Sequence, residues 1–292
     1  MSVRNLQSLF APQSIALIGA SQRPGSVGQV LMKNLLGQGF TGPILPVNPN
    51  ETMIASLTAY KDVASLPVTP DLAVICTPPA TVPGLIDALG QRGVKAAIVI
   101  TAGFAELGAE GRALQQKLLQ AARPRLLRII GPNCVGMLVP GVNLNASFAP
   151  VNALRGKLAF VTQSGAVLTS VLDWASSRNI GFSHMVSLGG MADVDFGDML
   201  DYLASDTDVS AVLLYVESIT HARKFMSAAR ACARIKPVIV IKAGRHAEGA
   251  KAASSHTGAL AGSDDVYEAA FRRAGMLRVT LLDELFEAVE TL

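Results

Sequence analysis

The sequence predicts an α/β protein of two successive domains, residues 1–150 and 151–292, each built on a parallel sheet. Two observations carry this prediction. Short runs rich in Val, Ile and Leu alternate with stretches of helical spacing along the chain, a pattern typical of repeated β–α units. The runs are apolar throughout, as expected for strands buried on both faces. The 292 residues, half of them hydrophobic, also suffice for two separate cores.

The first domain is predicted to begin with a strand at 14–19 that ends in glycine and leads into a helix at 27–36. Ligands of such sheets bind at the loops beyond the carboxyl ends of the strands, and these loops carry the domain's Gly, Pro and Asn. The remaining strands are expected at 43–47, 72–76, 96–100 and 126–130, with helices at 82–92 and 110–122.

The second domain is predicted to repeat this alternation after a boundary near 150–156, which follows the polar stretch 143–147. Its elements are predicted from the same apolar runs and helical spacings. Strands are expected at 157–162, 183–188, 211–216, 238–241 and 277–279, and helices at 165–177, 196–204, 222–233, 263–274 and 283–292.

Composition narrows the function classes. The net charge of +3 is small and no dense basic run occurs, so nucleic acid is not expected as a partner. No unbroken apolar stretch reaches about 18 residues, so no membrane span is expected, and residues 1–5 lack a signal-peptide core. Cys76, Cys134 and Cys232 are too far apart for a disulfide framework or a metal-ligand spacing. We therefore expect a cytoplasmic protein without a metal site.

The loop after the first strand is the first candidate for ligand binding. Glycines where the strand ends and the helix begins let backbone N–H groups approach a phosphate at the helix N-terminus. A purely structural role for these glycines is the alternative. The second strand leads into Val47 and Asn48 without the acidic residue that would bind an NAD ribose, so the expected nucleotide is not NAD. The loop reads Gly19-Ala20-Ser21-Gln22-Arg23-Pro24-Gly25-Ser26-Val27-Gly28.

Several further motifs follow in order: Pro46-Val47-Asn48-Pro49, Cys76-Thr77-Pro78-Pro79, Ile100-Thr101-Ala102-Gly103-Phe104 and Gly131-Pro132-Asn133-Cys134-Val135-Gly136. With the Gly19 loop, this set resembles the CoA-binding domain of the NDP-forming acyl-CoA synthetases, relatives of the succinyl-CoA synthetase alpha subunit. The resemblance implies a Rossmann-like CoA-binding domain followed by a flavodoxin-like domain, and it extends to the last residue.

The resemblance also implies which residues surround CoA or acyl-CoA. They are Gly19, Ala20, Ser21, Arg23, Gly25, Val27, Gly28, Val47, Asn48, Cys76, Thr77, Pro78, Thr101, Ala102, Gly103, Asn133 and Cys134. Many relatives carry Lys where this chain has Asn50, so Arg23 is the expected contact to a CoA phosphate. Cys134 is interpreted as a small buried residue beside the ligand, because nothing in the sequence marks a reactive thiol.

In the second domain, Gln163, Ser164, Gly165 and Ala166 follow a strand and open a helix. Exposed N–H groups at such a terminus form an anion site, and in the family this terminus holds the phosphate. Ser164 could be an N-cap alone. A hydrolase nucleophile is less favoured, because Thr162 stands where a nucleophile elbow needs Gly.

The catalytic candidates are His256, in the small-residue loop 254–258, and Glu217, at the end of a strand. In the family, the matching Glu orients a histidine that carries the phosphoryl group. A solvated surface role is the alternative for each residue considered alone. His184, His221 and His246 are interpreted as surface or packing residues, and no role is assigned to Asp193 or Asp195 in the loop after 183–188.

The mechanism implied by the resemblance has three stages. Acyl-CoA and phosphate give acyl phosphate and CoA, His256 takes the phosphoryl group, and a separate ATP-grasp domain or subunit transfers it to ADP. We therefore expect ATP or ADP with Mg²⁺ only through that partner. We also expect an oligomer, and a chain that is a fragment of a longer protein or one part of a split subunit.

A second function class stays open. Residues 144–148, 155–160 and 285–292 are also similar to the acyl-CoA synthetase-like region of bacterial protein lysine acetyltransferases. On that alternative the chain is a non-catalytic acyl-CoA-binding region with a GNAT acetyltransferase domain downstream. Some members of that group lose the histidine, so the presence of His256 favours the ligase.

Overall fold

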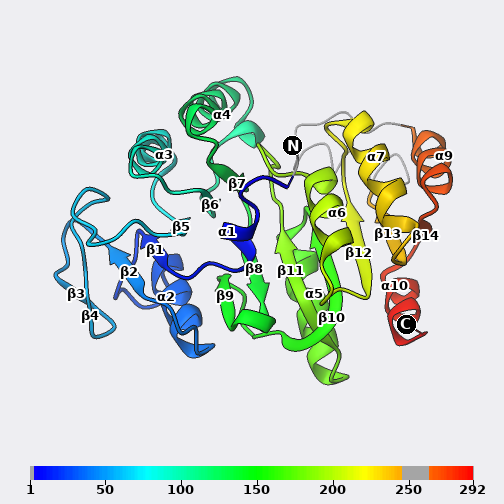
Figure 1. The fold of residues 1–292 in the computed structure, drawn as a ribbon, viewed down its shortest axis with the longest axis horizontal. Helices are drawn as coiled ribbons and strands as arrows, with labels where there is room; N and C mark the ends of the chain where they lie inside the picture. The colour runs from blue at the N-terminus through cyan, green and yellow to red at the C-terminus, as the bar shows by residue number, and fades with distance from the viewer. Residues whose placement is uncertain (1–2, 245–262, 292) are drawn as a thin grey trace.

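The computed structural model describes residues 3–244 and 263–291 and confirms the α/β prediction. Two large sheets lie side by side, each with helices on both faces (Figure 1). The short helix α1 (Gln7–Phe10) lies between them, and one continuous hydrophobic core includes side chains of both halves.

The first sheet has the order β2-β1-β5-β6-β7, and every pair is parallel. Its strands are β1 (Ile15–Ile18), β2 (Ile44–Val47), β5 (Leu72–Ile75), β6 (Ala96–Val99) and β7 (Arg128–Ile130). Nearly all of their side chains are buried, which explains the unbroken apolar runs. A small hairpin, β3 (Met53–Ile54) and β4 (Leu57–Thr58), follows β2.

Helices cover both faces of this sheet. Apolar side chains of α2 (Val27–Gly37) join the core on one face, together with those of α1. Those of α3 (Val82–Gln91) and α4 (Ala109–Ala122) form a separate core on the other face. Because the helices change face between β1 and β5, a crevice is expected beyond the carboxyl ends of these two strands.

The second sheet has the order β14-β13-β12-β10-β11-β8-β9. Its parallel part consists of β10 (Leu154–Thr162), β11 (Gly181–Ser187), β12 (Ala211–Val216), β13 (Val238–Lys242) and β14 (Leu277–Val279). This flavodoxin-like order places the equivalent crevice beyond β10 and β12.

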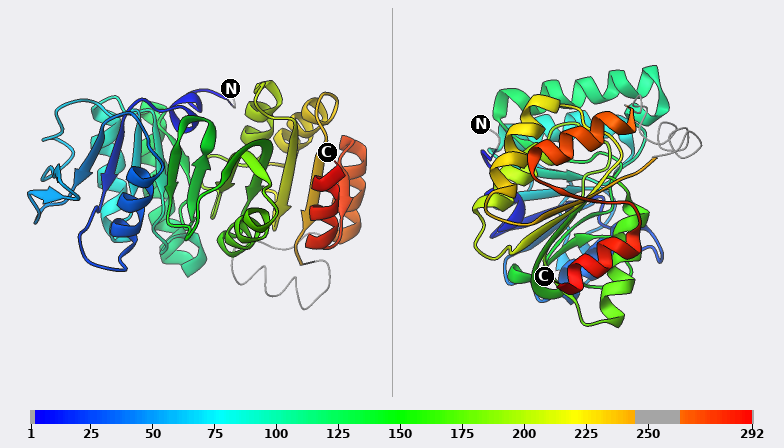
Figure 2. Two further views of the ribbon diagram at one scale, coloured as in Figure 1. Left: turned by 90° about the horizontal axis from the view of Figure 1, so that it is seen from below. Right: turned by 90° about the vertical axis from the view of Figure 1, so that its right-hand side faces the viewer.

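The helices of the second half also form two layers (Figure 2). On one face of the sheet lie α6 (Phe196–Ser205), α7 (Ala222–Ala233) and α9 (Asp264–Ala274). On the other face lie α5 (Gly165–Ser177) and α10 (Leu282–Thr291).

Four strands were not predicted: the short β3 and β4, and two strands that belong to the second sheet. The strands β8 (Gly136–Val139) and β9 (Leu144–Ser147) precede the expected boundary near 150, yet they pair antiparallel with the second sheet. The sequence of β9 is polar, which is why no strand was predicted there. Its polar side chains are nevertheless buried, and Ser147 Oγ donates to Asn145 Oδ1 at 2.6 Å. The chain therefore passes from the first sheet to the second through residues 131–135.

Candidate functional site

The loop after β1 is shaped by two glycines. Gly19 has a φ of +95°, and a Cβ on Gly28 would lie 2.0 Å from the Gly19 carbonyl oxygen. Ser26 caps α2 by accepting from Gln29 N at 3.3 Å. Asn48 Nδ2 donates to the Ala20 carbonyl at 2.8 Å and so ties the loop after β2 to this one. The close approach of Gly28 to Gly19 and the hydrogen bond from Asn48 therefore help to fix the path of this loop.

A cavity of about 620 Å³ opens beyond the carboxyl ends of β1, β5 and β6. Nine of the residues expected to surround CoA line it: Arg23, Val27, Cys76, Thr77, Pro78, Thr101, Ala102, Asn133 and Cys134. The others, Gly19, Ala20, Ser21, Gly25, Gly28, Val47, Asn48 and Gly103, do not line this cavity, although Ser21 lines a neighbouring hollow. Four lining residues were not predicted as CoA contacts, namely Ile100, Val135, Phe148 and Gly165.

Among the described residues that line this larger cavity, Arg23 is the only one with a positive charge. Its side chain is exposed, and its guanidinium makes no ion pair with the described part of the chain. The guanidinium is therefore available to an anionic ligand at the mouth of the cavity.

The two cysteines of the larger cavity are held as neutral thiols. Burial raises the pKa of Cys76 and of Cys134 to about 12. The thiol of Cys134 lies 3.4 Å from the Val99 carbonyl oxygen, to which it donates. These contacts agree with the expectation that Cys134 packs beside the site, since a nucleophilic cysteine needs a lowered pKa.

A smaller cavity of about 290 Å³ lies at the N-terminus of α5. It is lined by all four residues of the expected anion site and by Glu217: Gln163, Ser164, Gly165, Ala166 and Glu217. Ala105, Glu106, Asn133, Gly189 and Gly190 complete the lining. Ser164 is the N-cap of α5 and accepts from Val167 N at 3.4 Å, so the capping role and a position beside the cavity occur together.

The side chain of Gln163 is fully engaged with the loop after β12. Its Oε1 accepts from the backbone N–H groups of Glu217 and Ser218, at 2.7 and 2.8 Å, and its Nε2 donates to Ser218 Oγ at 3.2 Å. Gln163 thus fixes the backbone that carries Glu217. Ser218 was not identified from the sequence, because a serine after a strand has no distinctive signal.

Glu217 is half-buried at the carboxyl end of β12. Burial raises the pKa of the neighbouring Tyr215, and the charge of Glu217 raises it further. At the end of β13, burial lowers the pKa of Lys242, against the opposing effects of Asp264 and Glu217. His256, which Glu217 is expected to orient, lies outside the described residues.

The two cavities are contiguous. Asn133 and Gly165 line both of them. A Cβ on Gly165 would lie 2.4 Å from Val135 Cγ2, and a Cβ on Gly189 would lie 2.2 Å from the Asn133 carbonyl oxygen. We call the two cavities with their shared wall the composite site. It lies where the loops of the first and second sheets meet.

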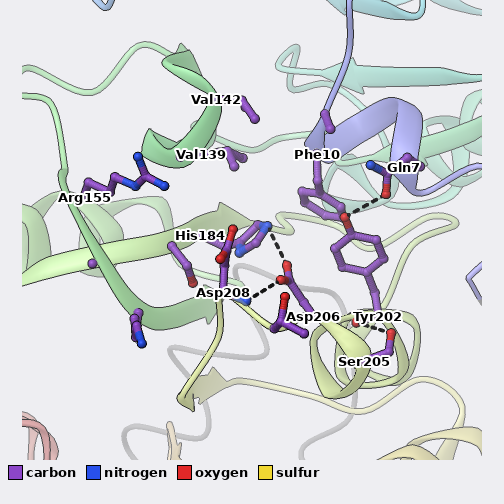
Figure 3. Close-up of a pocket in the computed structure, with 16 residues that line it drawn as sticks. Gln7, Phe10, Val139, Val142, Arg155, His184, Tyr202, Ser205, Asp206 and Asp208 are labelled. Atoms are coloured by element: carbon purple, nitrogen blue, oxygen red, sulfur yellow. Dashed lines mark hydrogen bonds and ion pairs between the residues drawn. The ribbon is translucent and has the colours of Figure 1, made fainter.

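The other described histidines lie apart from the composite site. His184, from β11, is buried against Phe10 with ring centroids 5.3 Å apart, and Asp206 Oδ2 lies 3.6 Å from its Nε2 (Figure 3). Burial lowers its pKa to about 4, although Asp206 opposes that shift. His221 is exposed before α7, and His246 lies outside the described residues. His184 is therefore a packing residue beside a cavity of about 550 Å³ near the amino ends of β10 and β11.

Comparison with known proteins identifies both halves. Residues 13–140 match the family described as "CoA binding domain", and residues 155–292 match "Succinyl-CoA ligase like flavodoxin domain". Together these matches define a CoA-binding, succinyl-CoA ligase-like protein. The chain belongs to the NDP-forming acyl-CoA synthetase family, and its relatives include alpha-type subunits of ADP-forming acetate–CoA ligases.

Two curated relatives illustrate the match. The chain is 44% identical to the alpha subunit of "Acetate--CoA ligase [ADP-forming] I" of Pyrococcus furiosus, across 97% of this chain and 62% of that one. It is 43% identical to "Acetate--CoA ligase [ADP-forming] I" of Archaeoglobus fulgidus, across 97% of this chain and 41% of that one. The chain therefore spans about two fifths to three fifths of these relatives.

A solved structure agrees. The dinucleotide forming acetyl-coenzyme A synthetase 1 of Ca. Korarchaeum cryptofilum, in complex with phosphate and ADP, superposes with a TM-score of 0.93 and 40% identity. The match covers 98% of this chain and 61% of that one. Within the described residues, no group of His, Cys, Asp and Glu is arranged to hold a metal ion, and none of the helices there is long and apolar enough to cross a membrane.

Proposed function

We propose that this chain is the alpha-type portion of an ADP-forming acyl-CoA synthetase, which interconverts acyl-CoA, phosphate and ADP with a free acid, CoA and ATP. The observation that carries the proposal is the composite site. A cavity of about 620 Å³ with a cation at its mouth shares Asn133 and Gly165 with an anion cavity at a helix N-terminus. A thioester in the first cavity and a phosphate in the second would therefore come together beside Asn133 and Gly165.

The first step follows from this arrangement. Phosphate binds at the first turn of α5, where unpaired N–H groups and the helix dipole stabilise its charge. One phosphate oxygen attacks the thioester carbonyl carbon, the carbon–sulfur bond breaks, and CoA leaves as its thiolate. The products are an acyl phosphate and CoA. Neutral Cys134 takes no covalent part in this step, because burial holds its pKa at about 12.

His256 takes the phosphoryl group in the second step. One neutral ring nitrogen attacks phosphorus and the free acid leaves, so the other nitrogen must keep its proton in a fixed hydrogen bond. Glu217 supplies that acceptor and balances the charge of the phosphohistidine. The hydrogen bonds that Gln163 Oε1 accepts from the Glu217 loop support this role, because they fix the backbone from which the carboxylate projects.

An ATP-grasp domain or subunit completes the reaction by transferring the phosphoryl group from His256 to ADP with Mg²⁺. Names of relatives support a small acyl group such as acetyl, since the P. furiosus and A. fulgidus proteins are acetate–CoA ligases. We infer that the reaction takes place in the cytoplasm, where the CoA and adenine-nucleotide pools are found.

The test is ATP formation by the chain assembled with its ATP-grasp partner. Acetyl-CoA, phosphate and ADP should give ATP and free CoA in equal amounts, and omission of phosphate should abolish both products. Isothermal calorimetry on the same sample should show acetyl-CoA binding. Binding without any phosphate-dependent turnover would contradict the proposal and favour a non-catalytic acyl-CoA-binding region.

A further inference from the structure

Five charged side chains form a network behind the composite site, where β7 at the edge of the first sheet faces α6 and α7 of the second half. Arg128 Nε of β7 lies 2.8 Å from Asp193 Oδ2, and Arg128 Nη2 lies 3.1 Å from Asp198 Oδ2. Lys224 Nζ of α7 lies 2.8 Å from Asp198 Oδ2 and 2.9 Å from Asp195 Oδ1. We call these five residues the ion network.

The ion network is substantially buried. The side chain of Asp198 is 2% exposed, and burial raises its pKa while Lys224 and Arg128 oppose the shift. Asp195 also caps α6 by accepting from Gly197 N at 2.8 Å and Asp198 N at 3.1 Å. Removing one partner from such a network leaves a buried charge without compensation, so the geometry of its members is tightly constrained.

Asp193 connects this network to the backbone of the composite site. Its Oδ2 accepts from Ile129 N at 2.9 Å in addition to Arg128 Nε. On either side of Asp193, backbone hydrogen bonds run from Val194 N to Ile129 O at 3.0 Å and from Ala192 N to Gly131 O at 3.0 Å. Segment 190–194 therefore runs antiparallel along 129–132, as an added strand would.

These two segments lead directly into the composite site. Gly190 N donates to Pro132 O at 2.8 Å. Gly189 and Gly190 line the smaller cavity from the second half, and Asn133 lines both cavities from the first. The register of 190–194 on 129–132 thus sets the distance between the walls of the two cavities.

We propose that Asp193 is a positioning residue for acyl transfer to phosphate. Held by Arg128, it fixes the loop after β11 against the segment after β7 and so sets the spacing between the thioester cavity and the phosphate cavity. This inference rests on the proposed function. Reacting atoms must approach to about 3–3.5 Å, and a shift of about 1 Å can cost about 100-fold in rate. Binding of CoA, which involves mainly the first domain, should depend much less on Asp193.

The experiment uses the chain assembled with its ATP-grasp partner and measures phosphate-dependent ATP formation from acetyl-CoA. Asp193→Ala should lower kcat about 100-fold and leave the KM for acetyl-CoA within about threefold. Asp193→Asn keeps an oxygen acceptor for Ile129 N but carries no charge for Arg128, so it should recover part of the lost kcat. A residue with a merely structural role would not give this separation of kcat from KM or its partial rescue.

Lys236→Met provides the matched control. Lys236 Nζ donates to the Leu203 carbonyl at 2.7 Å and to the Asp206 carbonyl, at the end of α6 remote from the ion network. This change should lower the melting temperature and leave kcat unchanged. The inference would be overturned if both Asp193 variants had the wild-type kcat, or if their decrease in kcat were no greater than that of Lys236→Met. A wild-type assembly that binds acetyl-CoA without making ATP would instead overturn the proposed function, and this inference with it.

Discussion

At the scale of single residues, the position and the charge of Arg23 indicate an anionic ligand. Arg23 is the only cation among the described residues of the larger cavity and makes no ion pair with them. Charge-assisted hydrogen bonds from a guanidinium to phosphate are about twice as strong as neutral ones. CoA carries a ribose phosphate that dephospho-CoA lacks. Comparing the affinities of the two ligands therefore tests a contact between the Arg23 guanidinium and that phosphate.

Arg23→Ala should therefore weaken CoA binding about tenfold, a typical value for a partly exposed charge-assisted contact, and weaken dephospho-CoA binding much less. Calorimetry on the purified chain measures both affinities. Arg112→Ala removes an exposed arginine of α4 outside the cavity and serves as the control. Equal losses for CoA and dephospho-CoA in Arg23→Ala would exclude a contact to the ribose phosphate.

The sequence predicts residues with a chemical signature better than residues that only shape the site. Arg23, Thr101 and Asn133 follow strands and carry polar groups, and they line the larger cavity. Val135 and Phe148 line it as well, but the sequence alone does not distinguish an apolar side chain that lines a cavity from one in the hydrophobic core. Asp193 received no role from the sequence, because its partner Arg128 lies 65 residues earlier and only the fold brings them together.

At the scale of elements, the N-terminus of α5 is the point where the two cavities meet. Gly165 opens this helix, and a Cβ there would lie 2.4 Å from Val135 Cγ2. The first turn of α5 can lie this close to the 131–135 segment because Gly165 has no side chain. A larger residue must push the helix or Val135 away from the shared wall.

Gly165→Ala should lower the free energy of unfolding by about 1–3 kcal/mol, the usual cost of overpacking, and should also slow phosphate-dependent turnover. Denaturant unfolding and the ATP assay measure the two effects. Adding Val135→Ala should restore part of both, because it removes the contacting methyl groups. Gly37→Ala, at the end of α2 with nothing within 4 Å of its Cβ, should be close to neutral. A Gly165→Ala protein as stable and active as the wild type would contradict this packing argument.

The elements themselves differ in how far the sequence determines them. The parallel strands were predicted to within a few residues, because burial on both faces leaves continuous Val, Ile and Leu runs such as β12 and β13. The hairpin of β8 and β9 was missed because Asn145 and Ser147 are buried but polar. Helix α1 was missed because its four residues are too few to show a helical period.

At the scale of the whole molecule, the first sheet supplies one wall of the composite site and the second sheet supplies the helix terminus and Glu217. Neither half contains the composite site alone. We propose that this site passes a phosphoryl group to His256, which lies outside the described residues. Of the other histidines, His184 is buried beside Asp206 near the amino ends of β10 and β11, and His221 is exposed before α7, so neither lies at the composite site. His246, like His256, lies outside the described residues.

The most direct measurement is mass spectrometry of the chain assembled with its ATP-grasp partner, treated with ATP and Mg²⁺ and kept at neutral or alkaline pH. We expect an acid-labile, alkali-stable phosphoryl group on His256 that is absent in His256→Ala. Glu217→Gln should slow its formation by about 10²–10⁴-fold, the usual cost of losing a positioned acid–base group, while CoA binding stays unchanged. A phosphoryl group on Ser164 instead, or undiminished ATP formation by His256→Ala, would show that His256 does not carry the phosphoryl group.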